Sequence, residues 1–227
     1  MIPKVVYQTW KTKQLPREYE IILNHNKNLN PEYQFILLDD DDLVKFFNLQ
    51  DALIKNAFFK INPKYGAAKA DLFRYVIIYL NGGIYLDIKI KCIQPFREWI
   101  INTDQGILSY WENLYYQKEA LQNLKGELQN WHIIFEKNHC FLKKVIEIVC
   151  QRILKVTDST FLIGKQAVLQ NTGPLIYTQT IENLLWENIS NPVRFINSAL
   201  VFDYGFSFFG LDKNTHYSLC KEPLFLL

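Results

Sequence analysis

The fold is decided by residues 64–90, which read KYGAAKADLFRYVIIYLNGGIYLDIKI. The alanines in the first half favour a helix, and apolar residues recur there every three or four positions. This spacing predicts a helix over residues 64–80. The Asn-Gly-Gly sequence at 81–83 ends it, because glycine readily adopts the left-handed conformation found after a helix C-terminus. Residues 84–90 then follow directly as a predicted strand.

The predicted strand carries chemically different side chains on its two faces. Successive residues of a strand point to opposite sides, so residues two apart share a face. One face is apolar: Ile84, Leu86, Ile88 and Ile90. The other combines an aromatic ring, an acid and two amines: Tyr85, Asp87, Lys89 and Lys91. We therefore expect the first face to join the core and the second to collect charges at one edge.

The N-terminal third alternates strands and helices. Strands are predicted over residues 5–10 and 33–38, and helices over residues 18–28 and 43–47. The aspartates at 39–42 offer N-caps to the second helix, and such an acidic run is more typical of a solvated turn than of a site. This alternation indicates a parallel sheet with crossover helices.

The rest of the chain continues the α/β pattern less regularly. It predicts helices over 113–129, 142–154 and 175–188, a turn at 171–174, and short strands over 193–196 and 200–204. The length of 227 residues suits one well-packed domain. We expect a single α/β domain over residues 1–227, with a mainly parallel central sheet flanked by helices.

Composition excludes several classes of protein. A formal charge of +2 without a basic stripe argues against a nucleic-acid partner. The four cysteines have no C-x-x-C spacing, so free thiols are expected and not a zinc site. The N-terminus has no leader pattern, and no apolar stretch reaches the roughly 18 residues of a membrane span. We expect a cytoplasmic protein without a transmembrane segment, and peripheral contact with a membrane stays open.

Two charge pairs lie in the stretch that decides the fold. Asp71 and Arg74 are three residues apart, so they share a helix face, and an ordinary surface ion pair explains such spacing. Asp87 and Lys89 share a strand face, and a charge pair at a sheet edge explains them. The helix, turn and strand can instead bring both pairs to the end of the sheet where α/β proteins bind ligands. Both explanations remain open.

The stretch also resembles a family signature. Residues 70–75, ADLFRY, and 79–87, YLNGGIYLD, look like the donor-site motifs A-D-x-x-R-Y and G-G-I-Y-x-D-x-D of the OCH1-like glycosyltransferases of family 32. Residues 2–10, IPKVVYQTW, are similar to that family's opening, residues 31–40 to its second strand, and residues 172–174, TGP, to a later motif. The family's catalytic domains are in turn similar to those of large clostridial glucosylating toxins.

The resemblance implies a GT-A type, Rossmann-like fold and a retaining transfer of a hexose from UDP or GDP to a glycan, lipid-linked or protein acceptor. Residues 1–100 would form the nucleotide-sugar donor half, and 101–227 the acceptor half. The donor-binding residues implied are Gln8, Thr9, Trp10, Asp71, Arg74, Tyr85, Asp87 and Thr172. Asp71 and Arg74 would hold hydroxyls of the sugar, and Asp87 would lie against ribose and diphosphate. A carboxylate and a guanidinium suit paired hydroxyls, because one accepts and the other donates.

One residue departs from the signature. The family's D-x-D reads Asp87-Ile88-Lys89 here, and a lysine cannot take the place of a metal-binding aspartate. Lys89, with Lys91, would then neutralise the departing diphosphate, which predicts reduced or absent dependence on Mn²⁺ or Mg²⁺. The predicted catalytic set is Asp71, Arg74, Asp87 and Lys89. The alternative is a degenerate site in a protein that binds a nucleotide sugar without turnover.

Histidines give the remaining candidates. His216 resembles a C-terminal histidine of the family, so Asp87 and His216 are the candidate ligands for a metal that could still enter. His132 and His139 are seven residues apart in apolar surroundings, which favours packing or surface roles over a ligand pair.

Overall fold

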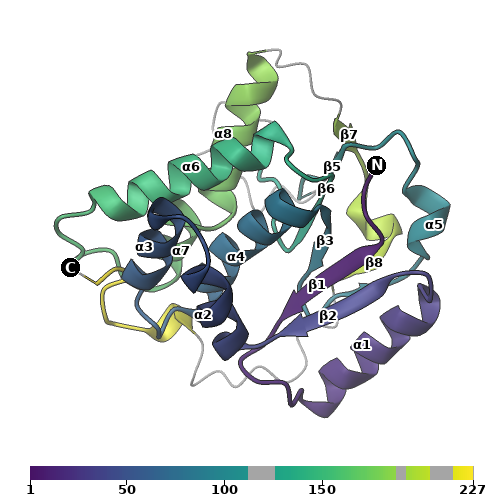
Figure 1. Ribbon diagram of the computed structural model, residues 1–227, viewed down its shortest axis with the longest axis horizontal. Helices are drawn as coiled ribbons and strands as arrows, with labels where there is room; N and C mark the ends of the chain where they lie inside the picture. Colours follow the sequence, from purple (N-terminus) through teal and green to yellow (C-terminus); the bar gives the residue numbers. More distant parts are fainter. Residues whose placement is uncertain (112–125, 188–192, 205–216, 227) are drawn as a thin grey trace.

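The computed structural model describes residues 1–111, 126–187, 193–204 and 217–226. Within them, six strands form one sheet in the order β2-β1-β3-β6-β5-β7 (Figure 1). These strands are β1 (Val5–Thr9), β2 (Gln34–Leu38), β3 (Gly83–Leu86), β5 (Gly106–Leu108), β6 (His132–Phe135) and β7 (Val193–Phe195). β1 is parallel to β2 and β3, and β7 is parallel to β5, whereas β6 is antiparallel to both of its neighbours. The α/β class and the mainly parallel sheet are confirmed.

Helices cover both faces of this sheet. They are α1 (Arg17–Leu29), α2 (Asp40–Asn48), α3 (Ala52–Lys60), α4 (Gly66–Asn81), α5 (Phe96–Trp99), α6 (Cys140–Lys155), α7 (Gly164–Asn171) and α8 (Pro174–Trp186). Short pieces complete the chain: β4 (Lys91–Cys92) pairs with β8 (Phe202–Asp203), and single 3₁₀ turns are η3 (Ser198–Leu200) and η5 (Tyr217–Leu219). No helix among the described residues is both long and apolar enough to cross a membrane.

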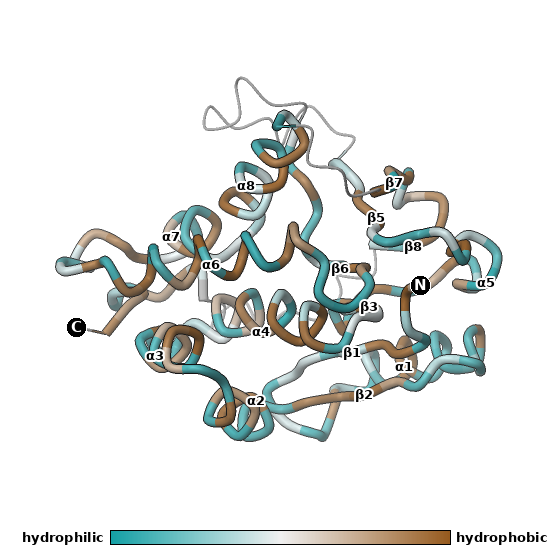
Figure 2. The backbone as a smooth tube through the Cα atoms, turned by 45° about the horizontal axis from the view of Figure 1, so that its top comes forward, coloured by the Kyte–Doolittle hydropathy of each residue, from teal (hydrophilic) through white to brown (hydrophobic). Residues whose placement is uncertain are grey.

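Strand alternation divides the core in two. On β1, Tyr7 joins a large cluster with residues of α3, α4, α6 and α8, whereas Val6 points to the opposite face and packs with Ile84 and Phe96. Figure 1 accordingly shows α1 on one side of the sheet and α4 and α6 on the other. Hydrophilic and hydrophobic segments alternate along α6 in Figure 2, as expected for a helix with one face on the core.

Most predicted elements are present within a few residues of their expected bounds. Asp39 caps α2 through a reciprocal capping box with Asp42, so the acidic run begins a helix as expected. The sequence patterns do not predict the helices α3, α5 and α7 or the strands β4, β5 and β6. The strand predicted over 200–204 is a 3₁₀ turn followed by the two residues of β8. Residues 126–129 are not helical, and the rest of the helix predicted over 113–129 lies outside the described residues.

The strand predicted over 84–90 is wrong in its second half. β3 ends at Leu86, and a turn follows that is closed by a hydrogen bond from Ile90 N to Asp87 O at 3.0 Å. The apolar alternation continues because α1 covers this turn, with the Asn26 side chain donating to Ile90 O at 2.8 Å. Strand alternation therefore does not govern the positions of Lys89 and Lys91.

The Gly82-Gly83 pair turns the chain from α4 into β3. Both residues have positive φ angles, +69° and +105°, which residues other than glycine rarely adopt. Space is also lacking, since a Cβ on Gly82 would lie 2.7 Å from Lys137 N and one on Gly83 2.6 Å from Val5 Cγ1. This tight connection holds the C-terminal turn of α4 directly against the start of β3, as the sequence predicts.

Candidate functional site

The candidate site lies where the central parallel strands end. β1 and β3 run in register, with Tyr7 opposite Tyr85, so the carboxyl ends of both strands reach the same edge. There the Thr9 hydroxyl hydrogen-bonds the Tyr85 hydroxyl at 2.9 Å, and the Tyr85 hydroxyl donates to Asp87 Oδ1 at 3.2 Å. This is the edge at which open α/β sheets bind ligands.

Arg74 links the helix to this edge. Its Nη2 lies 3.5 Å from Asp71 Oδ1 and 3.3 Å from Asp87 Oδ1, and its guanidinium stacks over the Tyr85 ring at 4.6 Å. Asp71 and Arg74 are only 5% and 6% exposed. An ordinary surface ion pair is therefore the wrong explanation of the Asp71–Arg74 spacing. The pair is buried, and Arg74 also contacts Asp87 of the second predicted charge pair.

Two residues distant in sequence complete the surroundings of Asp71. Asn130 Nδ2 donates to Asp71 Oδ1 at 3.1 Å, and the Thr172 hydroxyl donates to Asp71 Oδ2 at 3.0 Å. The Asn130 carbonyl also accepts from Arg74 Nη1 at 2.6 Å. Thr172 had been implied by the family resemblance. Asn130 was missed, because nothing in its local sequence marks it.

The charges of this cluster are strongly perturbed. Burial raises the pKa of Asp71 to about 6, against the lowering effects of Arg74 and of the Thr172 hydroxyl. Burial alone would lower the pKa of Arg74, but Tyr85, Asp87 and Asp71 together hold it above its ordinary value. Arg74 therefore stays charged. Asp71 takes up a proton at a mildly acidic pH, which is a property more typical of functional sites than of surface pairs.

Lys89 stands at the open side of the cluster. It and Asp87 are partly exposed, whereas Ile88 and Ile90 beside them in the turn are buried. The Lys89 ammonium lies over the Tyr204 ring at 5.1 Å and donates to the Tyr204 hydroxyl at 3.5 Å. Burial alone would lower the pKa of Lys89, but Asp87 and Tyr204 raise it above its ordinary value. Lys89 is thus a charged amine in the electrostatic field of Asp87. Tyr204 was not anticipated from the sequence.

The three residues implied at the N-terminus occupy different environments. Thr9 and Trp10 are partly exposed, and the Trp10 ring packs edge-on against Tyr19 at 4.9 Å. Gln8 is 1% exposed, and neither its amide nitrogen nor its amide oxygen has a hydrogen-bond partner among the described residues. A buried amide without partners is unusual, since such groups cost free energy unless they are paired.

Histidines contribute no metal site that the structure describes. His132 is a buried residue of β6 whose Nε2 lies 2.6 Å from the Ser109 hydroxyl, and burial lowers its pKa to about 3. His139 is the N-cap of α6 and is also buried, so neither has a surface role. His216 lies outside the described residues. Among the residues described, no three His, Cys, Asp or Glu side chains gather as ligands for a metal ion.

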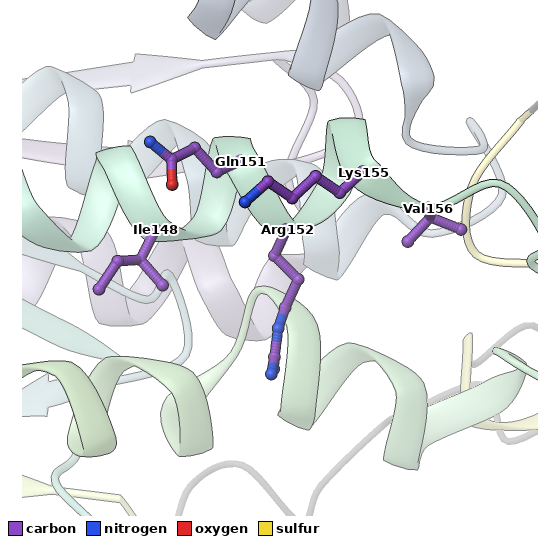
Figure 3. A pocket seen from close by; sticks show the side chains of 5 residues that line it. All are labelled: Ile148, Gln151, Arg152, Lys155 and Val156. Atoms are coloured by element: carbon purple, nitrogen blue, oxygen red, sulfur yellow. The ribbon is translucent and has the colours of Figure 1, made fainter.

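A surface hollow lies elsewhere, along the C-terminal half of α6. It is lined by Ile148, Gln151, Arg152, Lys155 and Val156, and Figure 3 shows these side chains along one stretch of the helix and the turn after it. None of them belongs to the cluster around Arg74. The hollow therefore adds nothing to the candidate site.

Comparisons with known proteins find similar glycosyltransferases. Residues 16–105 match the family described as "Glycosyltransferase sugar-binding region containing DXD motif", a range that includes Asp71, Arg74 and Asp87. The chain is 27% identical over 225 residues to an initiation-specific alpha-1,6-mannosyltransferase of Candida albicans, covering 86% of this chain and 56% of that protein. It is also 27% identical over 180 residues to inositol phosphoceramide mannosyltransferase 3 of Schizosaccharomyces pombe, covering 77% and 43%. The chain thus spans about half the length of these curated relatives.

Solved structures show the same fold. The UDP-bound glycosyltransferase domain of the YGT toxin superposes with a TM-score of 0.57 at 10% identity, covering 86% of this chain and 79% of that one. The PaToxG glycosyltransferase gives a TM-score of 0.53 at 18% identity, covering 83% and 70%. The expected glycosyltransferase fold and the family resemblance are confirmed.

Proposed function

We propose that this chain, which carries the sugar-binding region of the DXD-type glycosyltransferases, transfers a hexose with retention from a nucleoside diphosphate sugar to a glycan, lipid-linked or protein acceptor. The observation that carries the proposal is the buried cluster of Asp71, Arg74 and Asp87. It lies inside the matched region and at the ligand-binding edge of the sheet.

The cluster suits recognition of a sugar. Asp71 accepts one hydrogen bond on each carboxylate oxygen. Its Oδ1 also faces Arg74 Nη2 at 3.5 Å, so the second lone pair of Oδ2 is the one that a sugar hydroxyl can use. Arg74 is fixed by the carbonyls of Ala70 and Asn130, at 3.2 and 2.6 Å, so its Nη2 is held between the two carboxylates. A rigid donor beside a rigid acceptor orients a sugar without reorganising when the substrate binds.

In the transfer, the bond between the anomeric carbon and the diphosphate oxygen breaks, and its electron pair stays on the diphosphate. The acceptor oxygen bonds to the anomeric carbon on the face that the diphosphate leaves, and its proton passes to the departing diphosphate. Asp71 and Arg74 hold the sugar hydroxyls, and Asp87 orients the ribose and diphosphate. Charge that develops on the diphosphate requires nearby cations, which are the largest source of transition-state stabilisation in such sites.

The relatives narrow the choice of sugar and nucleotide in the donor substrate. Both relatives named above are mannosyltransferases, which favours a mannosyl donor, and one structural neighbour was solved with UDP. We retain UDP- or GDP-hexose as the donor class. Residues 1–100 would then serve mainly the donor and 101–227 mainly the acceptor, although Asn130 and Thr172 extend the donor site into the second part. The cytoplasmic location stays a prediction, as does peripheral contact with a membrane.

A panel of UDP- and GDP-hexoses tests the function directly. We expect at least one to bind in calorimetry and to be hydrolysed or transferred when acceptors are supplied. Binding without turnover across all donors and acceptors would favour the alternative of a non-catalytic nucleotide-sugar-binding protein. Absence of binding would contradict both.

The substitution Asp71→Asn tests the assigned role. It keeps the size of the side chain but removes the charge that grips the sugar, so transfer should lose about 2–4 kcal/mol of transition-state stabilisation. Affinity for UDP or GDP alone should change little, because these ligands lack the hexose. Asp41→Asn, on the exposed face of α2, is the matched control. Near-normal turnover of Asp71→Asn would contradict the role.

A further inference from the structure

Residues 79–87 resemble a family signature that carries a second aspartate two positions after Asp87, and this chain has Lys89 at that position. The matched family is described by its DXD motif, and the sequence that follows β3 here is Asp87-Ile88-Lys89. Residues 39–42 also read as consecutive aspartates, but the first and last of them form the capping box of α2 and are engaged there. The residue beside Asp87 at the open side of the cluster is therefore a lysine.

The charges around Asp87 balance without an added ion. Asp71 and Asp87 contribute −1 each when ionised, and Arg74 and Lys89 contribute +1 each, which sums to zero. An aspartate at position 89 would change the sum to −2, which one divalent cation would neutralise. Replacing that aspartate by lysine thus shifts the local charge by the same +2 that such a cation supplies.

The donor set also fits a divalent cation poorly. Mg²⁺ requires oxygen ligands in near-octahedral geometry, and Mn²⁺ prefers carboxylates as well. Asp87 Oδ1 already accepts from the Tyr85 hydroxyl and lies 3.3 Å from Arg74 Nη2. The described residues supply no cluster of three acidic, histidine or cysteine side chains around it. An incoming divalent ion would in addition meet the positive charges of Arg74 and Lys89.

We propose that Lys89 binds the diphosphate of the nucleotide directly, in the place where DXD relatives would use a metal ion. The inference rests on the proposed function and specifies how its leaving group is stabilised. Arg74 is fixed and sits behind Asp87, so it supplies a constant positive field. Lys89 is tethered by a weaker contact, 3.5 Å to the Tyr204 hydroxyl, and its flexible stem lets the ammonium turn from Tyr204 to a phosphate oxygen.

Arg74 and Lys89 would stabilise the departing diphosphate in different ways. As the glycosidic bond breaks, its electron pair becomes negative charge on the diphosphate oxygen. Lys89 is partly exposed and is the cation that binds this oxygen, whereas the buried Arg74 acts on it through its field. Tyr204 holds the Lys89 ammonium beside the cluster, with its hydroxyl 3.5 Å and its ring centroid 5.1 Å from the Lys89 nitrogen. Tyr204 is then a positioning residue for Lys89.

Calorimetric titration with UDP, GDP, UMP and GMP tests the inference, each in excess EDTA and again with MnCl₂. The wild-type protein should bind its preferred diphosphate with affinities that agree within about two-fold in the two buffers. Lys89→Met, which keeps an unbranched apolar side chain and removes the ammonium, should weaken UDP or GDP binding at least ten-fold in EDTA and leave monophosphate binding unchanged. Lys143→Met, on the exposed face of α6, is the control for a lost positive charge.

The reverse experiment restores the acidic pair. Lys89→Asp should bind the diphosphate weakly in EDTA and regain affinity at least ten-fold with MnCl₂. The inference is overturned if MnCl₂ strengthens wild-type binding more than ten-fold, if Lys89→Met binds diphosphates as well as wild type, or if no diphosphate binds. Thermal unfolding of each variant separates a lost contact from a lost fold.

Failure of this inference can be told apart from failure of the proposed function. Hexose transfer that requires MnCl₂ would support the proposed function and contradict the role of Lys89. The opposite outcome is nucleotide binding that needs Lys89 but no metal, without transfer of any hexose. It would support the role of Lys89 and contradict the proposed function.

Discussion

Two aspartate–arginine pairs of this protein share their chemistry and differ in their environment. Arg194 binds Asp104 through two short bonds, 2.9 and 2.7 Å, at the edge of the sheet. Arg74 contacts Asp71 at 3.5 Å and divides its positive charge between two carboxylates. Burial alone would raise the pKa of Asp104, but hydrogen bonds from Arg194 and from Ile101 N hold it below its ordinary value. The pKa of Asp71 is instead raised to about 6.

The two pairs differ in how much their charged carboxylates contribute to the stability of the fold. The carboxylate of Asp104 gains more from its partners than it loses by burial, whereas that of Asp71 loses more than it gains. Buried ion pairs of the second kind contribute little net stability, although removing one partner is costly. Retention of such a cluster fits the functional role proposed for it.

The largest effect is expected for Arg74→Met. The substitution leaves Asp71 and Asp87 without their cation in a buried site, so the free energy of unfolding should fall by about 3–5 kcal/mol. Urea denaturation at neutral pH measures it. The exposed Arg97→Met, which removes a surface contact to Glu32 at 3.7 Å, should cost less than about 1 kcal/mol. Equal costs for the two variants would break the contrast.

An intermediate effect, on stability alone, is expected for Asp104→Asn. Asparagine keeps one acceptor oxygen and places an amide donor where the other accepted, so the two-point contact with Arg194 is lost, and the free energy of unfolding should fall by about 1.5–3 kcal/mol. Transfer should keep its kcat/KM within about two-fold, because this pair lies outside the cluster around Arg74. A ten-fold loss of transfer in a folded Asp104→Asn protein would show that the two pairs are not independent.

The smallest effect is a pH dependence of opposite sign at the two carboxylates. Asp71 has a higher pKa in the folded than in the unfolded protein. The free energy of unfolding of wild type relative to that of Asp71→Asn should therefore fall by about 1 kcal/mol per pH unit as the pH rises from about 4 to 6. Asp104 has a lower pKa folded, so its contribution is present at neutral pH and lost as the pH falls below about 4. Denaturation curves between pH 3.5 and 7 would sharpen the contrast, and parallel profiles would contradict it.

Sequence patterns predicted those parts of the molecule whose signals are local. α4, the Gly82-Gly83 turn and β3 were found because helix propensity, glycine conformation and alternation act within a few residues. The end of β3 was not found, since Ile88 and Ile90 are buried in a turn and alternate as they would in a strand. The turn that follows the strand is covered by α1, whose Asn26 side chain donates to Ile90 O across 64 positions of sequence.

The candidate site was likewise predictable only where its residues lie within a local sequence motif. Asp71, Arg74 and Asp87 belong to a recognisable signature, and the structure brings them together. Their burial was not predictable, because an i,i+3 pair looks the same on an exposed helix. Asn130 and Tyr204 carry no signal of their own and become relevant only through tertiary contacts with Asp71 and Lys89.

The hydrogen bonds of Asp71 also set an order of events in folding. Its partners lie 59 and 101 residues further along the chain, so a nascent protein makes α4 long before it makes Thr172. Until those partners dock, the Asp71 carboxylate keeps its hydration shell, and covering it early would be unfavourable. Contacts of such long sequence separation form slowly because closing the loop costs entropy first. The proposed sugar site should therefore be completed late in folding, after the sheet around β1 and β3 has already formed.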